Sequence, residues 1–159
     1  MRIGSVLLLC VIAIAPAHGV DKVARDDPAY LRANHAGVEH VTVPGSVEDA
    51  FVAIRNGVSH CYVDRKNPLL WPNTVGIIAQ GSVKRRIKVE LSDDKTWGYV
   101  MYGVKAFWYA PAFQFDVRAT EVGVEVTFYY DNDNKLQRSA FANAKAWLDG
   151  KPDTCTNAH

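Results

Sequence analysis

The sequence lacks a strong charge of either sign, a hydrophobic run long enough to cross a membrane, and the glycine-rich or nucleophile motifs of common enzyme classes. Its 159 residues include 18 Lys and Arg against 17 Asp and Glu, a formal charge of +1. This balance gives no overall attraction to nucleic acid or to an anionic membrane surface. The longest apolar run, residues 6–15, has ten residues, whereas a transmembrane helix needs about 20. Neither a transmembrane segment nor a nucleic-acid partner is predicted.

The first residues have the three parts of a secretory signal peptide. Arg2 gives a positive start, residues 6–15 form the apolar core, and Ala15-Pro16-Ala17 supplies small residues where a signal peptidase cleaves. We expect a signal peptide over 1–17, with cleavage after Gly19 as the alternative. The mature protein is therefore predicted to be periplasmic or secreted.

The three cysteines divide into one in the signal peptide and two in the mature chain. Cys10 lies inside the apolar core, where it is interpreted as an apolar residue rather than a lipid-attachment site. Cys61 and Cys155 remain, an even count in an exported chain, which predicts a disulfide closing a loop of about 95 residues. A metal site would need a spacing such as Cys-x-x-Cys, and a cysteine nucleophile would need protection from oxidation. The sequence supplies neither.

The first part of the mature chain predicts an arm, one strand and one helix. Residues 18–37 are polar and irregular, which indicates an extended N-terminal arm or linker with room for one short turn. Residues 38–43 predict a short strand. Ser46 is a suitable N-cap and apolar residues follow at helical spacing, so a helix is expected over 46–59. A loop over 64–73 follows it.

The second part changes to a period of two, which predicts an antiparallel sheet. Strands are expected over 75–79, 86–91, 97–109, 113–118 and 122–130, with an interruption near Gly103 and a break at 110–112. An amphipathic stripe predicts a last helix over 135–148. The expected class is α+β, with an antiparallel sheet of about five to six strands, one short N-terminal helix and a long C-terminal helix packed on one face. Residues 38–155 would form this single domain.

The order of these elements resembles the helix-grip layout of the START and polyketide-cyclase-like superfamily, over roughly residues 38–148. The chain is also similar to small exported proteobacterial proteins, often lipoproteins, of uncharacterised function. Those proteins have a cysteine after the first helix and a Trp-x-x-Gly before a terminal cysteine, here Cys61, Trp147 to Gly150, and Cys155. The helix-grip resemblance implies a cleft between the sheet and the last helix that holds an apolar ligand. Helix-grip relatives include cyclases and hydrolases, so a small enzyme is one alternative.

Candidate catalytic and metal-binding groups are few. The histidines are scattered along the chain as His18, His35, His40, His60 and His159. The acidic turn 131–134 lacks the Gly and Glu of a calcium loop. The basic run 84–88 predicts a solvated strand edge. An enzyme would require a buried polar pair such as His60 with Asp64, or Asp116 with Arg118. We expect no metal, no cofactor and no catalytic site.

Aromatic residues gather between positions 97 and 109. Those on the inner face of the sheet are expected to belong to the core under the last helix, whereas those facing outward would line a cleft or form an interaction patch. Period two places Phe107 and Tyr109 on one face and Trp108 on the other. The candidate binding residues are Trp97, Tyr99, Phe107, Trp108 and Tyr109.

Two kinds of recognition are compatible with these features. The expected function is a non-enzymatic periplasmic binding domain, which recognises either a small apolar ligand in the sheet–helix cleft or a protein partner through the aromatic patch. A cleft filled by Phe115, Phe128, Phe141 and Trp147 would disfavour the ligand. A periplasmic inhibitor, or an accessory of a secretion system or of the cell envelope, is the alternative.

Overall fold

The computed structural model describes residues 23–64, 84–105 and 108–156 of the chain. The elements are α1 (Ala29–Asn34), β1 (Gly37–Val43), α2 (Val47–Val58), the π-helical turn η1 (Ser59–Val63), β2 (Lys84–Leu91), β3 (Trp97–Lys105), β4 (Tyr109–Thr120), β5 (Gly123–Tyr130) and α3 (Lys135–Leu148). The predicted signal peptide, the predicted strand 75–79 and Phe107 lie outside the described residues.

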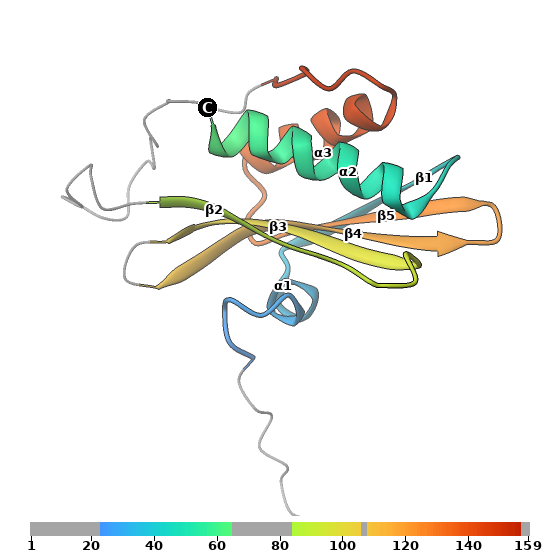
Figure 1. The fold of residues 1–159 in the computed structure, drawn as a ribbon. Helices are drawn as coiled ribbons and strands as arrows, with labels where there is room; N and C mark the ends of the chain where they lie inside the picture. Colours follow the sequence, from blue (N-terminus) through green and yellow to red (C-terminus); the bar gives the residue numbers. More distant parts are fainter. Residues whose placement is uncertain (1–22, 65–83, 106–107, 157–159) are drawn as a thin grey trace, which may run out of the picture.

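The five strands form one antiparallel sheet in the order β1-β5-β4-β3-β2. Helices α2 and α3 lie over one face of this sheet, and α1 lies against the other (Figure 1). We call these the first face and the second face. The predicted α+β class, with an antiparallel sheet and a C-terminal helix on one face, is confirmed.

Capping residues set where the two longer helices begin. The Ser46 hydroxyl accepts a hydrogen bond from the Asp49 amide at 3.1 Å, and the Asn134 side-chain oxygen accepts one from the Gln137 amide at 3.1 Å. Each bond satisfies one of the free N–H groups of a helix start. Both helices then turn an apolar stripe toward the first face, as their 3.6-residue periods predict.

Aromatic side chains fill the space between the first face and α3. Phe113, Phe115 and Phe128 are fully buried there. The Phe128 ring stacks on the Phe141 ring of α3, with their centroids 5.6 Å apart. Trp147 is also buried and lies next to α2. These side chains occupy the place where the cleft was predicted.

The predicted disulfide is present between Cys61 and Cys155, which are 94 residues apart in sequence. It attaches the C-terminal tail beside α2. Hydrogen bonds hold the same tail against α3: the Trp147 indole N–H donates to the Thr154 carbonyl at 2.7 Å, and the Thr156 amide donates to the Asn143 side-chain oxygen at 3.0 Å. The tail is thus fixed by covalent and polar contacts together.

The boundary between the two central strands differs from the predicted one. The sequence predicts that residues 110–112 end a strand, but β3 ends at Lys105 and β4 already begins at Tyr109. Pro111 lies within β4 opposite Gly103, where the pairing shifts register between Tyr102 and Gly103. Proline lacks an N–H for the ladder and is tolerated at such a bulge. Pro111 therefore continues β4 through an irregularity instead of ending a strand.

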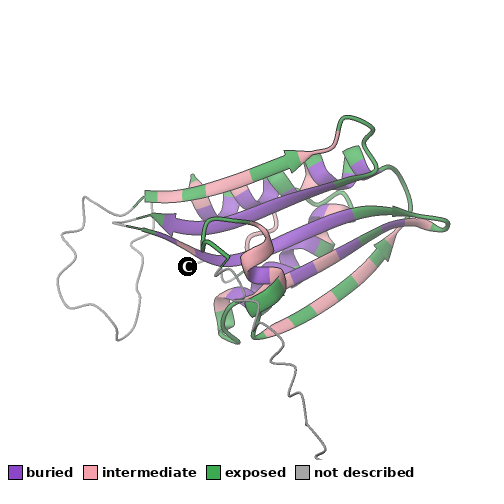
Figure 2. Ribbon diagram, turned by 90° about the horizontal axis from the view of Figure 1, so that it is seen from below, coloured by how far each residue is buried: buried purple, intermediate pink, exposed green. Residues whose placement is uncertain are grey.

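The N-terminal arm and the second face also differ from expectation. Residues 18–37 are predicted to be extended, yet Ala29–Asn34 forms helix α1, with Leu31 fully buried against the sheet. Gln114 and Asp116 alternate with apolar residues of β4, a pattern typical of a strand with one solvated face, but they are 0% and 4% exposed. Figure 2, seen from the side of α1, shows buried residues along the central strands, whereas the edge strands alternate between intermediate and exposed residues. Helix α1 packs on the second face, which buries Leu31 of the helix and shields Gln114 and Asp116 of the sheet from water.

Candidate binding site on the second face

Helix α1 covers a second, smaller hydrophobic cluster. Its buried members are Leu31, Tyr99, Met101 and Tyr109, with Tyr30 and Tyr129 packed against them. We call these six residues the tyrosine cluster. Burial raises the pKa of the Tyr109 hydroxyl above its ordinary value, so the group stays neutral. The second face is thus an apolar and aromatic surface in its centre rather than a solvated one.

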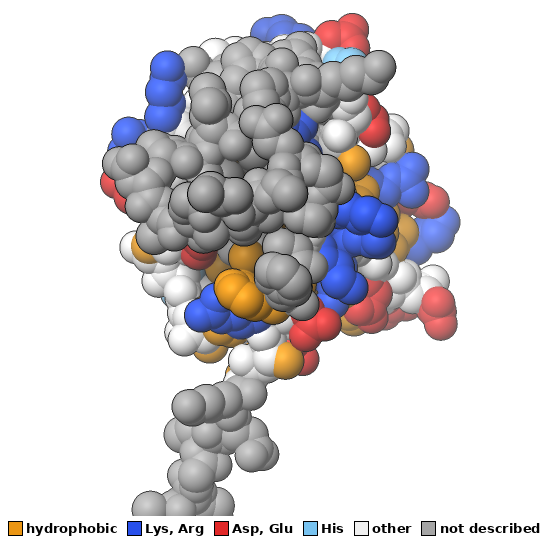
Figure 3. Space-filling view, turned by 90° about the vertical axis from the view of Figure 1, so that its left-hand side faces the viewer, with side chains coloured by type: hydrophobic (Ala, Val, Ile, Leu, Met, Phe, Trp, Pro, Cys, Tyr) orange, Lys and Arg blue, Asp and Glu red, His pale blue; other side chains and the backbone are white. Residues whose placement is uncertain are grey.

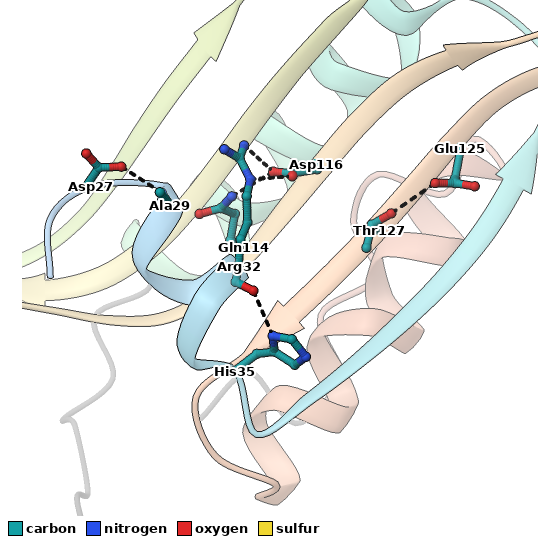
Figure 4. A network of polar contacts seen from close by, with 8 residues as sticks. All are labelled: Asp27, Ala29, Arg32, His35, Gln114, Asp116, Glu125 and Thr127. Atoms are coloured by element: carbon teal, nitrogen blue, oxygen red, sulfur yellow. Dashed lines mark hydrogen bonds and ion pairs between the residues drawn. The ribbon is translucent and has the colours of Figure 1, made fainter. Parts of the chain in front are cut away.

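A polar anchor beside the cluster holds α1 in place (Figure 4). Arg32 donates from Nε to Asp116 Oδ2 at 2.7 Å and from Nη2 to Asp116 Oδ1 at 2.9 Å. Gln114 Nε2 donates to the same carboxylate at 2.7 Å, and the Arg32 guanidinium carbon lies 5.9 Å from the Tyr99 ring centroid. The hydrogen bonds from Arg32 to Asp116 raise the pKa of the guanidinium above its ordinary value. A helix of six residues is not stable alone, so these contacts are what order it.

The residues just before α1 are tied to the opposite edge of the sheet. Lys88 on β2 donates to the Asp26 carbonyl at 2.7 Å and to Asp26 Oδ2 at 3.1 Å. The hydrogen bond from Lys88 lowers the pKa of the Asp26 carboxyl. The same ammonium lies 5.3 Å from the Tyr109 ring centroid. Together with α1, this contact positions Arg25 and Asp26 over the end of the sheet where β3 and β4 meet.

A cavity of about 390 Å³ opens at this end of the second face. Its lining residues are Arg25, Asp26, Lys105, Trp108 and Tyr109. Trp108 is 64% exposed, whereas Tyr109 is 8% exposed and forms the inner wall. Figure 3 looks onto this end of the molecule and shows hydrophobic side chains between groups of Lys and Arg. The cavity therefore joins an aromatic wall to a basic surface.

The strand register adds further cations beside the cavity. Tyr109 lies opposite Lys105, and Lys105 lies opposite Lys84 of β2. Arg86 shares the face of Lys84 and Lys88, since alternate residues of a strand point to the same side. Within the described residues, Arg25, Lys84, Arg86 and Lys105 form no ion pair. We call these four residues the basic rim.

The basic rim carries an electrostatic cost in the isolated chain. Lys84 and Lys105 are directly opposed in an antiparallel pair, where like charges are destabilising. Asp26, the one acid among the described residues that line the cavity, already binds Lys88. The site is thus able to attract an anionic group and to pack an apolar group against Trp108.

The structure separates the five predicted binding residues. Trp108 and Tyr109 meet at the cavity, because Trp108 precedes the first residue of β4 and is not bound by the strand alternation that would send it to the other face. Tyr99 is buried in the tyrosine cluster. Trp97 lies at the far end of β3, eight residues from Lys105 and roughly 27 Å away. Phe107 is outside the described residues.

Several site residues were not foreseen. Nothing in the local pattern near Arg25 or Lys105 marks them, because their proximity depends on the docking of α1 and on the strand register. The basic run 84–88 is the available signal, but a run of cations by itself predicts only a solvated strand edge. Of its residues on the second face, Lys84 lies opposite the lining residue Lys105, and the Lys88 ammonium lies over the ring of Tyr109.

The catalytic pairs considered from the sequence are not formed. Asp116 binds Arg32 rather than Arg118. His60 is exposed, and Asp64 accepts a hydrogen bond from the Ser59 hydroxyl at 3.4 Å. Within residues 23–64, 84–105 and 108–156, no three His, Cys, Asp or Glu side chains are grouped to hold a metal ion. None of the helices in that part of the chain is long and apolar enough to span a membrane.

A second, smaller cavity of about 200 Å³ lies between α2 and α3 at the edge of the first face. Ala50, Ala53, Trp147 and Leu148 are among its lining residues. Its volume is below the lower end of typical ligand cavities, about 300 Å³. It offers less room and fewer charged groups than the cavity beside Trp108.

Comparison with known proteins gives no match: no protein-family model, curated protein or solved structure is similar enough to this chain to assign it. Its function is therefore inferred from the geometry and chemistry of the second face.

Proposed function

We propose that the chain is a non-enzymatic binding domain, periplasmic or secreted, that recognises a protein partner through the cavity beside Trp108. The observation that carries this proposal is the exposure of Trp108, 64%, at the mouth of a 390 Å³ cavity. Tryptophan is enriched among the residues that dominate the binding energy of protein interfaces.

The alternative of a small apolar ligand in the sheet–helix cleft receives less support. Phe115, Phe128 and Phe141 fill that space with their own side chains. A ligand there would have to displace buried aromatic rings, each of which contributes about 3–5 kcal/mol to stability. The cavity on the second face is open without any such rearrangement.

Export is supported by two independent features. The signal peptide predicted over 1–17 would direct the chain out of the cytoplasm. The Cys61–Cys155 disulfide is the kind of bond that persists in oxidising compartments.

The proposal is tested by crosslinking in the native host, followed by purification of the mature protein. We expect one protein partner to be captured by the wild type and by Trp97→Ala, and to be lost with Trp108→Ala. Trp97 is the matched control because it is also a partly exposed tryptophan, 38%, on the same face but at the far end of β3. Equal capture by all three proteins would contradict the proposal. Recovery of a stoichiometric apolar small molecule, with no protein, would favour the cleft instead.

A further inference from the structure

The charge around the cavity is one-sided although the whole chain is nearly neutral. Arg25 and Lys105 line it, Lys84 lies opposite Lys105, Lys88 lies over the Tyr109 ring, and Arg86 stands between Lys84 and Lys88 on the same strand face. Among the described lining residues, Asp26 is the one acid. Lys88 and Asp26 neutralise each other, which leaves the four cations of the basic rim. A group that binds here and compensates the rim must carry several negative charges.

The openness of the cavity argues for a segment of a larger partner rather than a free small molecule. Small-molecule sites enclose about 70–90% of the ligand surface. With Trp108 64% exposed, one wall of this cavity faces solvent. A volume of 390 Å³ is instead suited to one or two side chains of a chain that continues along the surface.

The spacing of the cations indicates the conformation of that segment. Lys84 and Arg86 are alternate residues of one strand, so they repeat along β2 about every 6.8 Å. Carboxylates at alternate positions of an extended peptide repeat at the same distance. The row of positive charge ends at Glu90, which shares the face of these cations. A segment laid along β2 would thus bring its acidic residues to the cavity end and not to the far end.

From these features we infer that the site binds an extended acidic segment of its protein partner, with carboxylates at alternate positions on the basic rim and one apolar side chain against Trp108. This inference rests on the proposed function and names the chemistry of the partner. A single-stranded nucleic acid fits less well, since such sites stack successive bases on several exposed rings, and the other aromatic wall, Tyr109, is buried.

The inference is tested with a seven-residue peptide that has Glu at positions 1, 3 and 5 and Leu at position 7, titrated into the full mature protein by calorimetry. The control peptide has Gln in place of each Glu. We expect binding of the acidic peptide only, with an affinity that falls as salt rises. The double variant Lys84→Gln/Lys105→Gln and the single variant Trp108→Ala should each weaken binding by about tenfold or more.

A matched control variant and competing polyanions complete the experiment. Lys95 lies in the β2–β3 hairpin, away from the cavity, and pairs with Glu48 of α2. Lys95→Gln should therefore change the affinity by less than about twofold. A sulfated polysaccharide, a single-stranded oligonucleotide and vesicles containing anionic lipid are titrated at the same salt. Tighter binding of any of these than of the peptide would overturn the acidic-segment inference, as would equal binding by the wild type and Lys84→Gln/Lys105→Gln.

The two proposals fail in distinguishable ways. If Trp108→Ala abolishes capture of the native partner while the acidic peptide does not bind, the proposed function stands and the inference about the segment is wrong. If Trp108→Ala changes neither capture nor peptide binding, both are wrong.

Discussion

Arg32 and Asp116 are 84 residues apart in sequence and form a bidentate ion pair, with donor–acceptor distances of 2.7 and 2.9 Å. The pair joins the N-terminal segment to the middle of β4. Because Arg25 and Asp26 lie a few residues before the start of α1, this contact also positions one wall of the cavity. A structural ion pair and the candidate site are thereby coupled through one short helix.

Replacing Arg32 by Ala should lower the free energy of unfolding by about 2 kcal/mol, because the buried Asp116 carboxylate loses both charged hydrogen bonds. Urea denaturation followed by circular dichroism measures this. The control is Arg138→Ala, which removes an ion pair to Asp133 whose two side chains are 60% and 61% exposed and should cost less than about 0.5 kcal/mol. Equal losses in the two variants would show that the Arg32 pair behaves as an ordinary surface pair.

The disulfide should contribute a large share of the stability. Replacing Cys61 and Cys155 together by Ala removes a cross-link between residues 94 apart and should lower the free energy of unfolding by about 3–4 kcal/mol. Reducing agent should destabilise the wild type to a similar extent and leave the double variant unchanged. A wild type that is insensitive to reduction under conditions where free thiols are detected would contradict this expectation.

Gly57 should be needed where α2 meets α3. A Cβ atom added there would overlap the indole ring of the buried Trp147. In an uncrowded helix Gly→Ala stabilises by about 1 kcal/mol, but overpacking costs about 1–3 kcal/mol, so Gly57→Ala should lower the melting temperature. The control Val52→Ala, at an exposed position of α2, should leave it unchanged or slightly raised. A rise for Gly57→Ala would mean that the two helices are not closely packed.

The parts of the fold that follow from periodicity were predictable. Helix α3 occupies the predicted residues 135–148, and α2 falls within the predicted 46–59, because an amphipathic stripe and a capping side chain are local signals. Helix α1 has neither a long stripe nor a side-chain cap. It forms because Leu31 and Arg32 find partners on the sheet, and no local pattern encodes that.

The second face shows why the site was only partly predictable. Alternation of Gln114 and Asp116 with apolar neighbours looks the same whether the polar side faces water or another polar element. The same pattern suggested a pair of Asp116 with Arg118, its neighbour on the strand face. The actual partner, Arg32, is identified only when the chain is folded. Aromatic composition pointed to Trp108 and Tyr109, but the basic rim around them arises from strand register.

The pH dependence of stability should report on Asp131, at the junction of β5 and α3. Desolvation by burial raises the pKa of its carboxyl to about 6, partly offset by the hydrogen bond from Gln137 Nε2. Because the pKa is raised in the folded state, the stabilising contribution is complete below about pH 4 and is lost as the pH rises through about 6. Asp131→Asn mimics the neutral carboxyl and keeps an acceptor for Gln137. Its side-chain N–H can also reach the buried Gln137 Oε1, which has no hydrogen-bond partner among the described residues. The residue as a whole is exposed although its carboxyl is desolvated, so solvent screening limits the expected gain at pH 7.5 to about 1 kcal/mol. Urea unfolding at pH 7.5 and pH 4 should show that gain at the higher pH and none at the lower. The control Asp133→Asn, at an exposed ion pair in the same turn, should show no gain in stability at either pH. If Asp131→Asn instead gave a gain of equal size at both pH values, titration of the Asp131 carboxyl would be excluded as its cause.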